Sequence, residues 1–143
     1  MGTYLPATLP FPQPSTKEEI DFWKNCAQKV LAFKTCSACG YVHHPPLPIC
    51  PTCQSKTLIW KVAPETALLY SYTIVHHAVH PDIVAHVPYN VAVVLFPELN
   101  DLRLVSNVVD VTPGELEIGM PLHLVWEPCD DKMFLPRFCK GTG

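Results

Sequence analysis

The sequence of 143 residues has no basic run, no long apolar run and no common nucleotide-binding or hydrolase motif. Its ten lysines and arginines are scattered, and the formal net charge is -3. This argues against a general nucleic-acid binder, because such proteins gain most of their affinity by neutralising phosphates. No segment approaches the roughly 18 consecutive apolar residues of a membrane helix, so we expect no membrane contact. A Gly-x-Ser-x-Gly elbow, a Walker loop and a Rossmann fingerprint are also lacking.

The first residues of the sequence carry neither a basic segment nor a continuous apolar run, which a secretory signal peptide needs. Two disulfides would require an oxidising compartment, so the seven cysteines are expected to be reduced. An odd number of cysteines together with a metal site suits a reducing cytoplasm. We therefore expect a cytoplasmic protein.

Two Cys-x-x-Cys pairs are the most informative pattern in the sequence. Cys36 and Cys39, followed by Gly40, form the first pair, and Cys50 and Cys53 form the second pair after ten residues. Two such pairs supply the four thiolates of a tetrahedral structural zinc site. Four protein ligands close the site, so no coordination position is left for chemistry at the metal. A rubredoxin-like iron centre uses the same ligands and is the alternative.

The segment between the N-terminal arm and the first cysteine has the pattern of an amphipathic helix of about four turns, ending near residue 33. Two overlapping capping boxes precede it, one starting at Ser15 and one at Thr16. Phe22 lies off the apolar stripe and is expected to be partly exposed, and Cys26 is expected to be a half-buried structural residue. The stripe at helical spacing consists of Ile20, Trp23, Ala27, Val30 and Leu31.

The second half of the sequence changes to a pattern of short strands without a long helix between them. Five or six strands over about 80 residues fit a small closed barrel. A turn is expected at Asp130-Asp131, and the proline-rich residues 1–14 are expected to form an extended arm. The expected strands are 58–62, 67–75, 89–96, 102–109, 122–127 and 133–138.

Histidines are concentrated in the segment that follows residue 75. His76, His77, His80 and His86 lie there together with Asp82. This density is compatible with a second metal site or with titration near neutral pH. A solvated loop between two strands is the simpler interpretation, because no pair is placed on one helix face.

An ordered series of motifs resembles a known protein family. The series is Phe22-Trp23, Cys36-x-x-Cys39-Gly40, Pro45-Pro46, Cys50-Pro51-x-Cys53, Trp60, Tyr70-Ser71-Tyr72-Thr73, Ile118-Gly119-Met120-Pro121 and Leu135-Pro136-Arg137-Phe138. It is similar to the zinc-ribbon plus OB-fold proteins of acyl-CoA metabolism, long known as a domain of unknown function. The resemblance implies a mainly β chain in three parts. These are an arm and helix at residues 1–33, a rubredoxin-like zinc ribbon at 34–60, and a five-stranded OB-fold barrel at 61–143.

Members of this family are partners of thiolase-fold enzymes. The resemblance therefore implies a non-catalytic accessory subunit of a thiolase-like or retro-aldolase complex that acts on acyl-CoA thioesters. The catalytic residues belong to the partner in such complexes, and the small subunit supports the partner or helps to hold CoA. The residues that carry over are the structural Zn²⁺ ligands Cys36, Cys39, Cys50 and Cys53. CoA is a candidate ligand with no assigned contacts, since the glycine-free turn at 63–67 and the histidine-rich segment depart from the family pattern.

The partner interface is expected on residues 1–33 and on part of the ribbon. The first alternative function is an OB-fold protein that binds single-stranded nucleic acid, against which the acidic balance speaks. The second is a free-standing acyl-CoA binder, with Lys34, Lys56, Lys61 or Arg137 reaching the phosphates. The helix residues expected at the partner interface are Ile20, Phe22, Trp23, Ala27, Val30 and Leu31.

Overall fold

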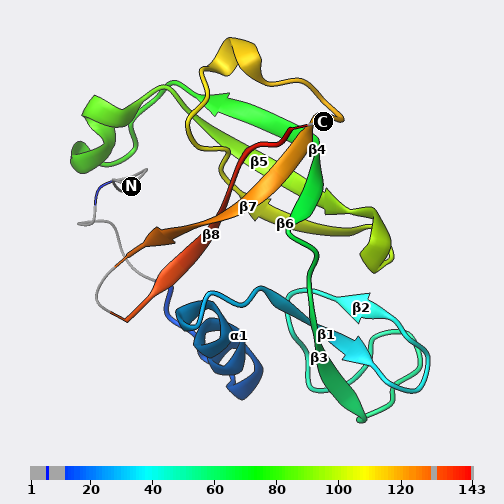
Figure 1. Cartoon of the computed structure of the whole chain (residues 1–143). Coiled ribbons are helices and arrows are strands. Elements are labelled where there is room, and N and C mark those ends of the chain that lie inside the picture. The colour runs from blue at the N-terminus through cyan, green and yellow to red at the C-terminus, as the bar shows by residue number, and fades with distance from the viewer. Residues whose placement is uncertain (1–5, 7–11, 130–131, 143) are drawn as a thin grey trace.

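A computed structural model describes residues 6, 12–129 and 132–142 as one helix, two β-sheets and three short 3-10 helices (Figure 1). No helix in these residues has the length and apolarity needed to cross a membrane. The elements in chain order are α1 (Lys17–Ala27), β1 (Ala32–Cys36), β2 (Val42–His43), β3 (Leu58–Val62), β4 (Thr66–Val75), η1 (Pro81–His86), β5 (Tyr89–Phe96), η2 (Pro97–Leu99), β6 (Leu102–Ser106), η3 (Pro113–Glu115), β7 (Pro121–Pro128) and β8 (Phe134–Lys140).

The capping box that starts at Thr16 begins helix α1. The backbone N–H of Glu19 donates to Thr16 Oγ1 at 3.1 Å, and Glu19 Oε2 accepts from the Thr16 N–H at 3.2 Å. The helix has 11 residues, about three turns, and ends at Ala27. The prediction of a helix to residue 33 is wrong, because Lys29 has a φ of 57° and the chain then enters strand β1. Left-handed backbone cannot continue a right-handed helix.

The buried face of α1 is formed by Phe22 and Cys26, which lie four residues apart and hence on one side of the helix. Phe22 is only 4% exposed, so the prediction of a partly exposed Phe22 is wrong. Ile20 of the predicted stripe is 40% exposed instead. In Figure 1, α1 lies below β8 and beside β1, and its residues contact both strands.

Strands β2, β1 and β3 form an antiparallel sheet in that order, and this sheet carries the two cysteine knuckles. β1 pairs with β3 from Ala32 opposite Val62 to Cys36 opposite Leu58. The ribbon sheet thus continues to Val62, whereas the expected boundary between ribbon and barrel is at residue 60. The three-part division of the chain stays a prediction.

The other five strands form an OB barrel with the order β6-β5-β4-β7-β8. The barrel closes where Val108, just after β6, pairs in parallel with Phe138 of β8. Backbone hydrogen bonds from Val109 N–H to Phe138 O, at 2.7 Å, and from Phe138 N–H to Asn107 O, at 3.1 Å, join the segment after β6 to β8. The predicted fold class, a mainly β chain with a helix, a zinc ribbon and a five-stranded OB fold, is confirmed. The expected turn at Asp130-Asp131 and most of the expected arm lie outside the described residues.

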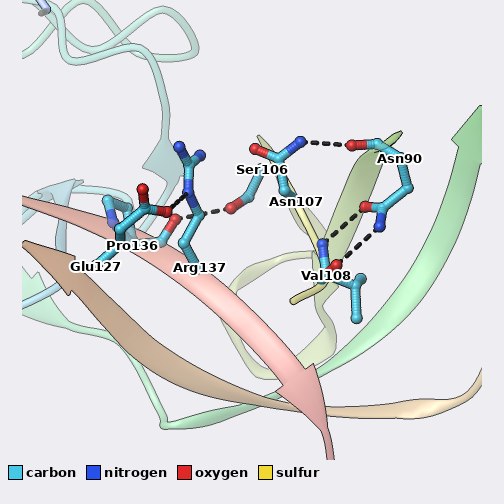
Figure 2. Close-up of polar contacts among 7 residues, drawn as sticks. All are labelled: Asn90, Ser106, Asn107, Val108, Glu127, Pro136 and Arg137. Atoms are coloured by element: carbon cyan, nitrogen blue, oxygen red, sulfur yellow. Dashed lines mark hydrogen bonds and ion pairs between the residues drawn. The ribbon is translucent and has the colours of Figure 1, made fainter. Parts of the chain in front are cut away.

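Buried polar side chains reinforce this closure (Figure 2). The Asn90 amide on β5 donates to Val108 O at 2.7 Å, and its Oδ1 accepts from the Val108 N–H at 2.8 Å. Ser106 Oγ donates to Pro136 O at 2.7 Å, which ties β6 to β8. Buried backbone N–H and C=O groups need hydrogen-bond partners. These side chains supply them at Val108 and Pro136, where β6 and β8 do not form a regular ladder.

One hydrophobic core connects the helix, the ribbon and the barrel. Phe33 of β1 lies 6.4 Å from Phe22 of α1 and 5.5 Å from Phe96 of β5, measured between ring centroids. Phe96 in turn meets Phe138 of β8 at 6.1 Å. Phe33, Phe96 and Phe138 have no exposed surface, so other atoms of the chain surround each ring. The zinc ribbon therefore packs as part of the barrel core.

Candidate functional site

The two cysteine knuckles have the same local backbone structure. Each begins with a buried cysteine, Cys36 at the end of β1 and Cys50 in the loop after β2. Gly40 N–H donates to Cys36 O at 2.8 Å, and Gln54 N–H donates to Cys50 O at 2.9 Å. Gly40 has a φ of 79° and Gln54 a φ of 62°, so both turns need a left-handed residue after the second cysteine.

The four thiols meet in a compact cluster. Cys36 Sγ lies 3.5 Å from Cys53 Sγ, and Cys39 Sγ lies 3.6 Å from Cys50 Sγ. All four sulfur atoms lie within 4.8 Å of one another. In a zinc tetrahedron with Zn–S bonds of about 2.3 Å, neighbouring sulfur atoms are about 3.8 Å apart. The thiol cluster therefore fits a structural Zn²⁺ ion, and the sulfur distances are far longer than a disulfide bond.

The electrostatics of the cluster also favour a cation. The backbone N–H of Cys39 donates to Cys36 Sγ at 3.4 Å and lowers the pKa of Cys36 to about 6. Cys50 has a lowered pKa because the backbone N–H groups of Cys53 and Thr52 stabilise its thiolate. A hydrogen bond from the Ser55 backbone N–H stabilises the Cys53 thiolate and lowers its pKa. The neighbouring thiols have the larger combined effect and raise the pKa of Cys53 to about 12. Four thiolates this close repel one another, and a zinc ion removes that repulsion.

The metal site has a structural role, because four cysteine ligands occupy all four positions of a tetrahedron. A zinc ion bound there would hold the two knuckles together. Because Phe33 and the ligand Cys36 lie on the same strand, β1, the ion would also fix the position of Phe33. Cys26, outside the cluster, is fully buried, and its burial raises the pKa of the thiol to about 12. A thiol that is protonated and covered is not a nucleophile, which agrees with a structural role for Cys26, but the expectation that it is half-buried is wrong.

The expected interface residues divide into two groups. Phe22 and Leu31 are 4% and 2% exposed and belong to the core of this chain, so a partner cannot reach them. Ile20 is exposed, while three others are half-buried, and these four are accessible to a partner. The interface itself stays a prediction. The half-buried residues are Trp23, Ala27 and Val30.

Sequence reasoning missed two adjacent histidines at the junction of ribbon, helix and barrel. His44 packs against Phe22 at 4.9 Å and Phe33 at 5.3 Å, and burial lowers its pKa to about 4. His43 is only 5% exposed. The available signal was the pair of histidines directly before Pro45-Pro46. His44 also faces a cleft of about 250 Å³ lined by Gln13, Pro14, Glu19, Phe22, Trp23, His44, Pro45 and Pro46.

Two of the four basic residues considered for CoA phosphates are engaged within the chain. Arg137 Nε lies 2.9 Å from Glu127 Oε2, and the two side chains are 15% and 8% exposed (Figure 2). Lys34 Nζ lies 4.8 Å from the centre of the Trp60 ring. Breaking a buried ion pair leaves an uncompensated charge, so Arg137 is poorly placed to bind a ligand.

The histidine-rich segment becomes the loop that contains η1. His80 Nδ1 accepts from the Asp82 N–H at 3.2 Å and thereby caps η1. Within the described residues, the four thiols are the only group of three or more His, Cys, Asp or Glu side chains close enough to share a metal ion. His76, His77 and His86 are therefore not gathered into a second metal centre by this structure.

Comparison with known proteins identifies both parts of the chain. The rubredoxin-like zinc ribbon domain of ChsH2 matches residues 23–58, and the C-terminal OB-fold domain of ChsH2 matches residues 60–127. A solved structure, the Ltp2-ChsH2(DUF35) aldolase, aligns with a TM-score of 0.81 and 35% identity over 90% of this chain and 98% of the matched chain. The chain belongs to the ChsH2/DUF35 family. The predicted resemblance to zinc-ribbon plus OB-fold proteins is confirmed.

Other relatives show the range of proteins in which this unit occurs. A probable enoyl-CoA hydratase alpha subunit of Thermomonospora curvata is 39% identical over 128 residues, which are 89% of this chain but only 39% of that relative. A DUF35 domain-containing scaffold protein of Methanothermobacter thermautotrophicus is 29% identical over 113 residues, 76% of this chain and 81% of the relative. A DUF35 structure from Sulfolobus solfataricus shares the fold, with a TM-score of 0.64, 19% identity, and 89% and 87% of the two chains covered.

Proposed function

We propose that this chain is a non-catalytic accessory subunit of a thiolase-like or retro-aldolase enzyme that acts on acyl-CoA thioesters. The similarity to the Ltp2-ChsH2(DUF35) aldolase carries the proposal, because it covers 98% of the matched chain at 35% identity. Because the aligned residues cover nearly all of the matched chain, we expect this chain to form the same kind of subunit contacts as that chain. The relative named as a scaffold protein supports a structural role.

The chemistry of the metal cluster supports an accessory role. All four thiols of the cluster are needed to close a zinc tetrahedron, so the metal organises the fold. The partner subunit would supply the catalytic residues, and CoA is a candidate ligand at the contact between the two subunits. The proposal places the chain in the cytoplasm, where cysteines stay reduced and available to zinc.

Affinity capture of the tagged chain from its native cells tests the proposal. We expect a thiolase-fold enzyme to co-purify in a fixed ratio and to be identified by mass spectrometry. Recovery of this chain alone, or with single-stranded nucleic acid released by salt, would contradict the accessory role.

The expected interface is tested separately with Ile20→Glu, a charge placed on the exposed edge of α1. The matched control is Ile118→Glu, which changes a 64% exposed isoleucine in the connection before β7. We expect the first variant to weaken the complex and the second to leave it intact, with both retaining zinc. Equal binding of the two variants would move the interface away from α1 without affecting the proposed function.

A further inference from the structure

A polar cleft of about 260 Å³ lies where the ribbon meets the barrel. Its ribbon side is formed by residues 41–44 around β2, and its barrel side by residues 100–103 at the turn into β6. Figure 1 shows this turn next to β2. The cleft is separate from the metal cluster, since none of the four cysteines lines it.

His43 supplies a buried hydrogen-bond donor at this cleft. The imidazole is 5% exposed, and desolvation lowers its pKa, so the ring is neutral at pH 7. Nε2 accepts from the Leu47 N–H at 3.3 Å, which leaves the hydrogen on Nδ1. Within the described residues, no atom accepts this N–H. A buried donor without a partner destabilises the folded chain, and a ligand oxygen that accepts from it would remove that penalty.

Arg103 supplies a positive charge on the opposite wall. Its guanidinium carbon lies 4.0 Å from the centre of the Tyr70 ring, which orients the planar group. The ion pairs found in the described residues do not include Arg103. Lys34 lies directly across the ribbon sheet from His43 and adds a second positive charge nearby. Among the described residues that line the cleft, Asp101 is the one carboxylate, and its charge acts against an anion.

We propose that this cleft binds an oxyanion, the phosphate or carboxylate group of a small ligand. The guanidinium of Arg103 and the Nδ1–H of His43 donate to its oxygens, because both groups offer donors and no acceptor. The Tyr41 ring lies parallel to the His43 ring at 6.3 Å and is 39% exposed. Tyr41 and His43 both line the cleft. The site does not depend on the proposed accessory function.

NMR titration of the full-length, zinc-loaded chain tests the site. Inorganic phosphate is added in one arm and acetate in another, at pH 7 and constant ionic strength. We expect saturable shifts of the His43 ring nitrogens and of Arg103 Nε. Saturation by phosphate alone identifies a phosphate ligand, and saturation by acetate identifies a carboxylate ligand.

Three variants define the charges involved. R103Q is expected to weaken binding by about tenfold or more, since it removes a charge-assisted contact. D101N is expected to strengthen binding by removing a repulsive charge. K140Q, which changes an exposed lysine that does not line the cleft, is expected to have no effect. Zinc content and thermal midpoint verify that each variant is folded.

Two results would overturn the proposal. Shifts that rise linearly with both anions, without saturation, would mean weak non-specific screening. Binding by R103Q with the affinity of the unmodified chain would show that the cleft does not recognise charge.

Discussion

Phe33 of the zinc ribbon and Phe96 of the barrel meet edge to face, with ring centroids 5.5 Å apart and an interplanar angle of 62°. Neither ring has exposed surface. Phe33 lies three residues before the metal ligand Cys36 on the same strand. The zinc site and the barrel core are therefore connected through one short strand, and the ribbon stabilises the barrel as well as itself.

Substitution of Phe33 is expected to destabilise the whole chain. Phe33→Ala removes a fully buried ring from the shared core and should cost about 3–5 kcal/mol. Ile59→Ala is the control on the same sheet, because Ile59 is 52% exposed, and it should cost less than about 1 kcal/mol. Chemical unfolding measures both values. Equal effects of the two variants would show that the ribbon and the barrel do not share a core.

Zinc removal is expected to loosen the barrel through the same strand. We expect one zinc ion per chain by elemental analysis, and a lower thermal midpoint after chelation. Cys50→Ser should lose the metal, whereas Cys139→Ser, which changes a cysteine outside the cluster, should keep it. Iron in place of zinc, or an unchanged midpoint in Cys50→Ser, would refute the structural zinc assignment.

Stability is expected to fall on mild acidification because of His44. Its pKa is about 4 in the folded chain, against 6.5 for an exposed histidine. Below pH 6.5 His44 is protonated in the unfolded chain but stays neutral in the folded chain. Stability therefore decreases with falling pH until the pH passes the pKa of His44 in the folded chain. Between pH 8 and pH 5 this effect amounts to about 2 kcal/mol.

Protonation of the zinc thiolates acts in the same direction, so a variant is needed to isolate the histidine. His44→Gln removes the titrating group and keeps the four cysteines. The difference in unfolding free energy between pH 8 and pH 5 should be smaller in this variant by the amount assigned to His44. The same pH dependence in both proteins would exclude His44 as its source.

The Asn90 side chain is expected to hold the barrel closed. Asn90→Ala leaves the N–H and C=O of Val108 buried without their side-chain partner, which should cost about 2–4 kcal/mol. Asn25→Ala on the half-buried part of α1 is the control and should cost less than about 1 kcal/mol. Hydrogen exchange at the Val108 amide gives a local measurement. Unchanged protection of this amide in Asn90→Ala would show that the Asn90 side chain does not hold the barrel closed.

The strands were predictable because their patterns are local. Residues 58–62 and 89–96 alternate or accumulate apolar side chains, and β3 and β5 have those same bounds. The helix was harder. Apolar residues at 20, 23 and 27 fit one helical face, and Phe22 with Cys26 fits another. Which of these faces is buried depends on β1 and β8, which pack against α1, and β8 is distant from α1 in sequence.

The metal site was predictable and the junction was not. Cys36 and Cys50 belong to Cys-x-x-Cys motifs whose spacing predicts a four-thiolate metal site, which the structure assembles. His43, His44 and Arg103 come together only because the ribbon docks on the turn before β6. No local pattern signals such a contact, because it forms between segments some 60 positions apart in the sequence. Tertiary packing of the ribbon on the barrel brings the two segments together.

The turnover of an acyl-CoA substrate by the reconstituted complex is the most direct test of the accessory role. The thiolase-fold enzyme that co-purifies with this chain should be assayed alone, with the zinc-loaded chain, and with the chain carrying Cys50→Ser. We expect this chain alone to have no activity, and the complex to be active and more stable than the enzyme alone. We also expect the Cys50→Ser chain to raise the activity and stability of the enzyme less than the zinc-loaded chain does. Equal activity and stability of the enzyme with and without this chain would contradict the accessory role.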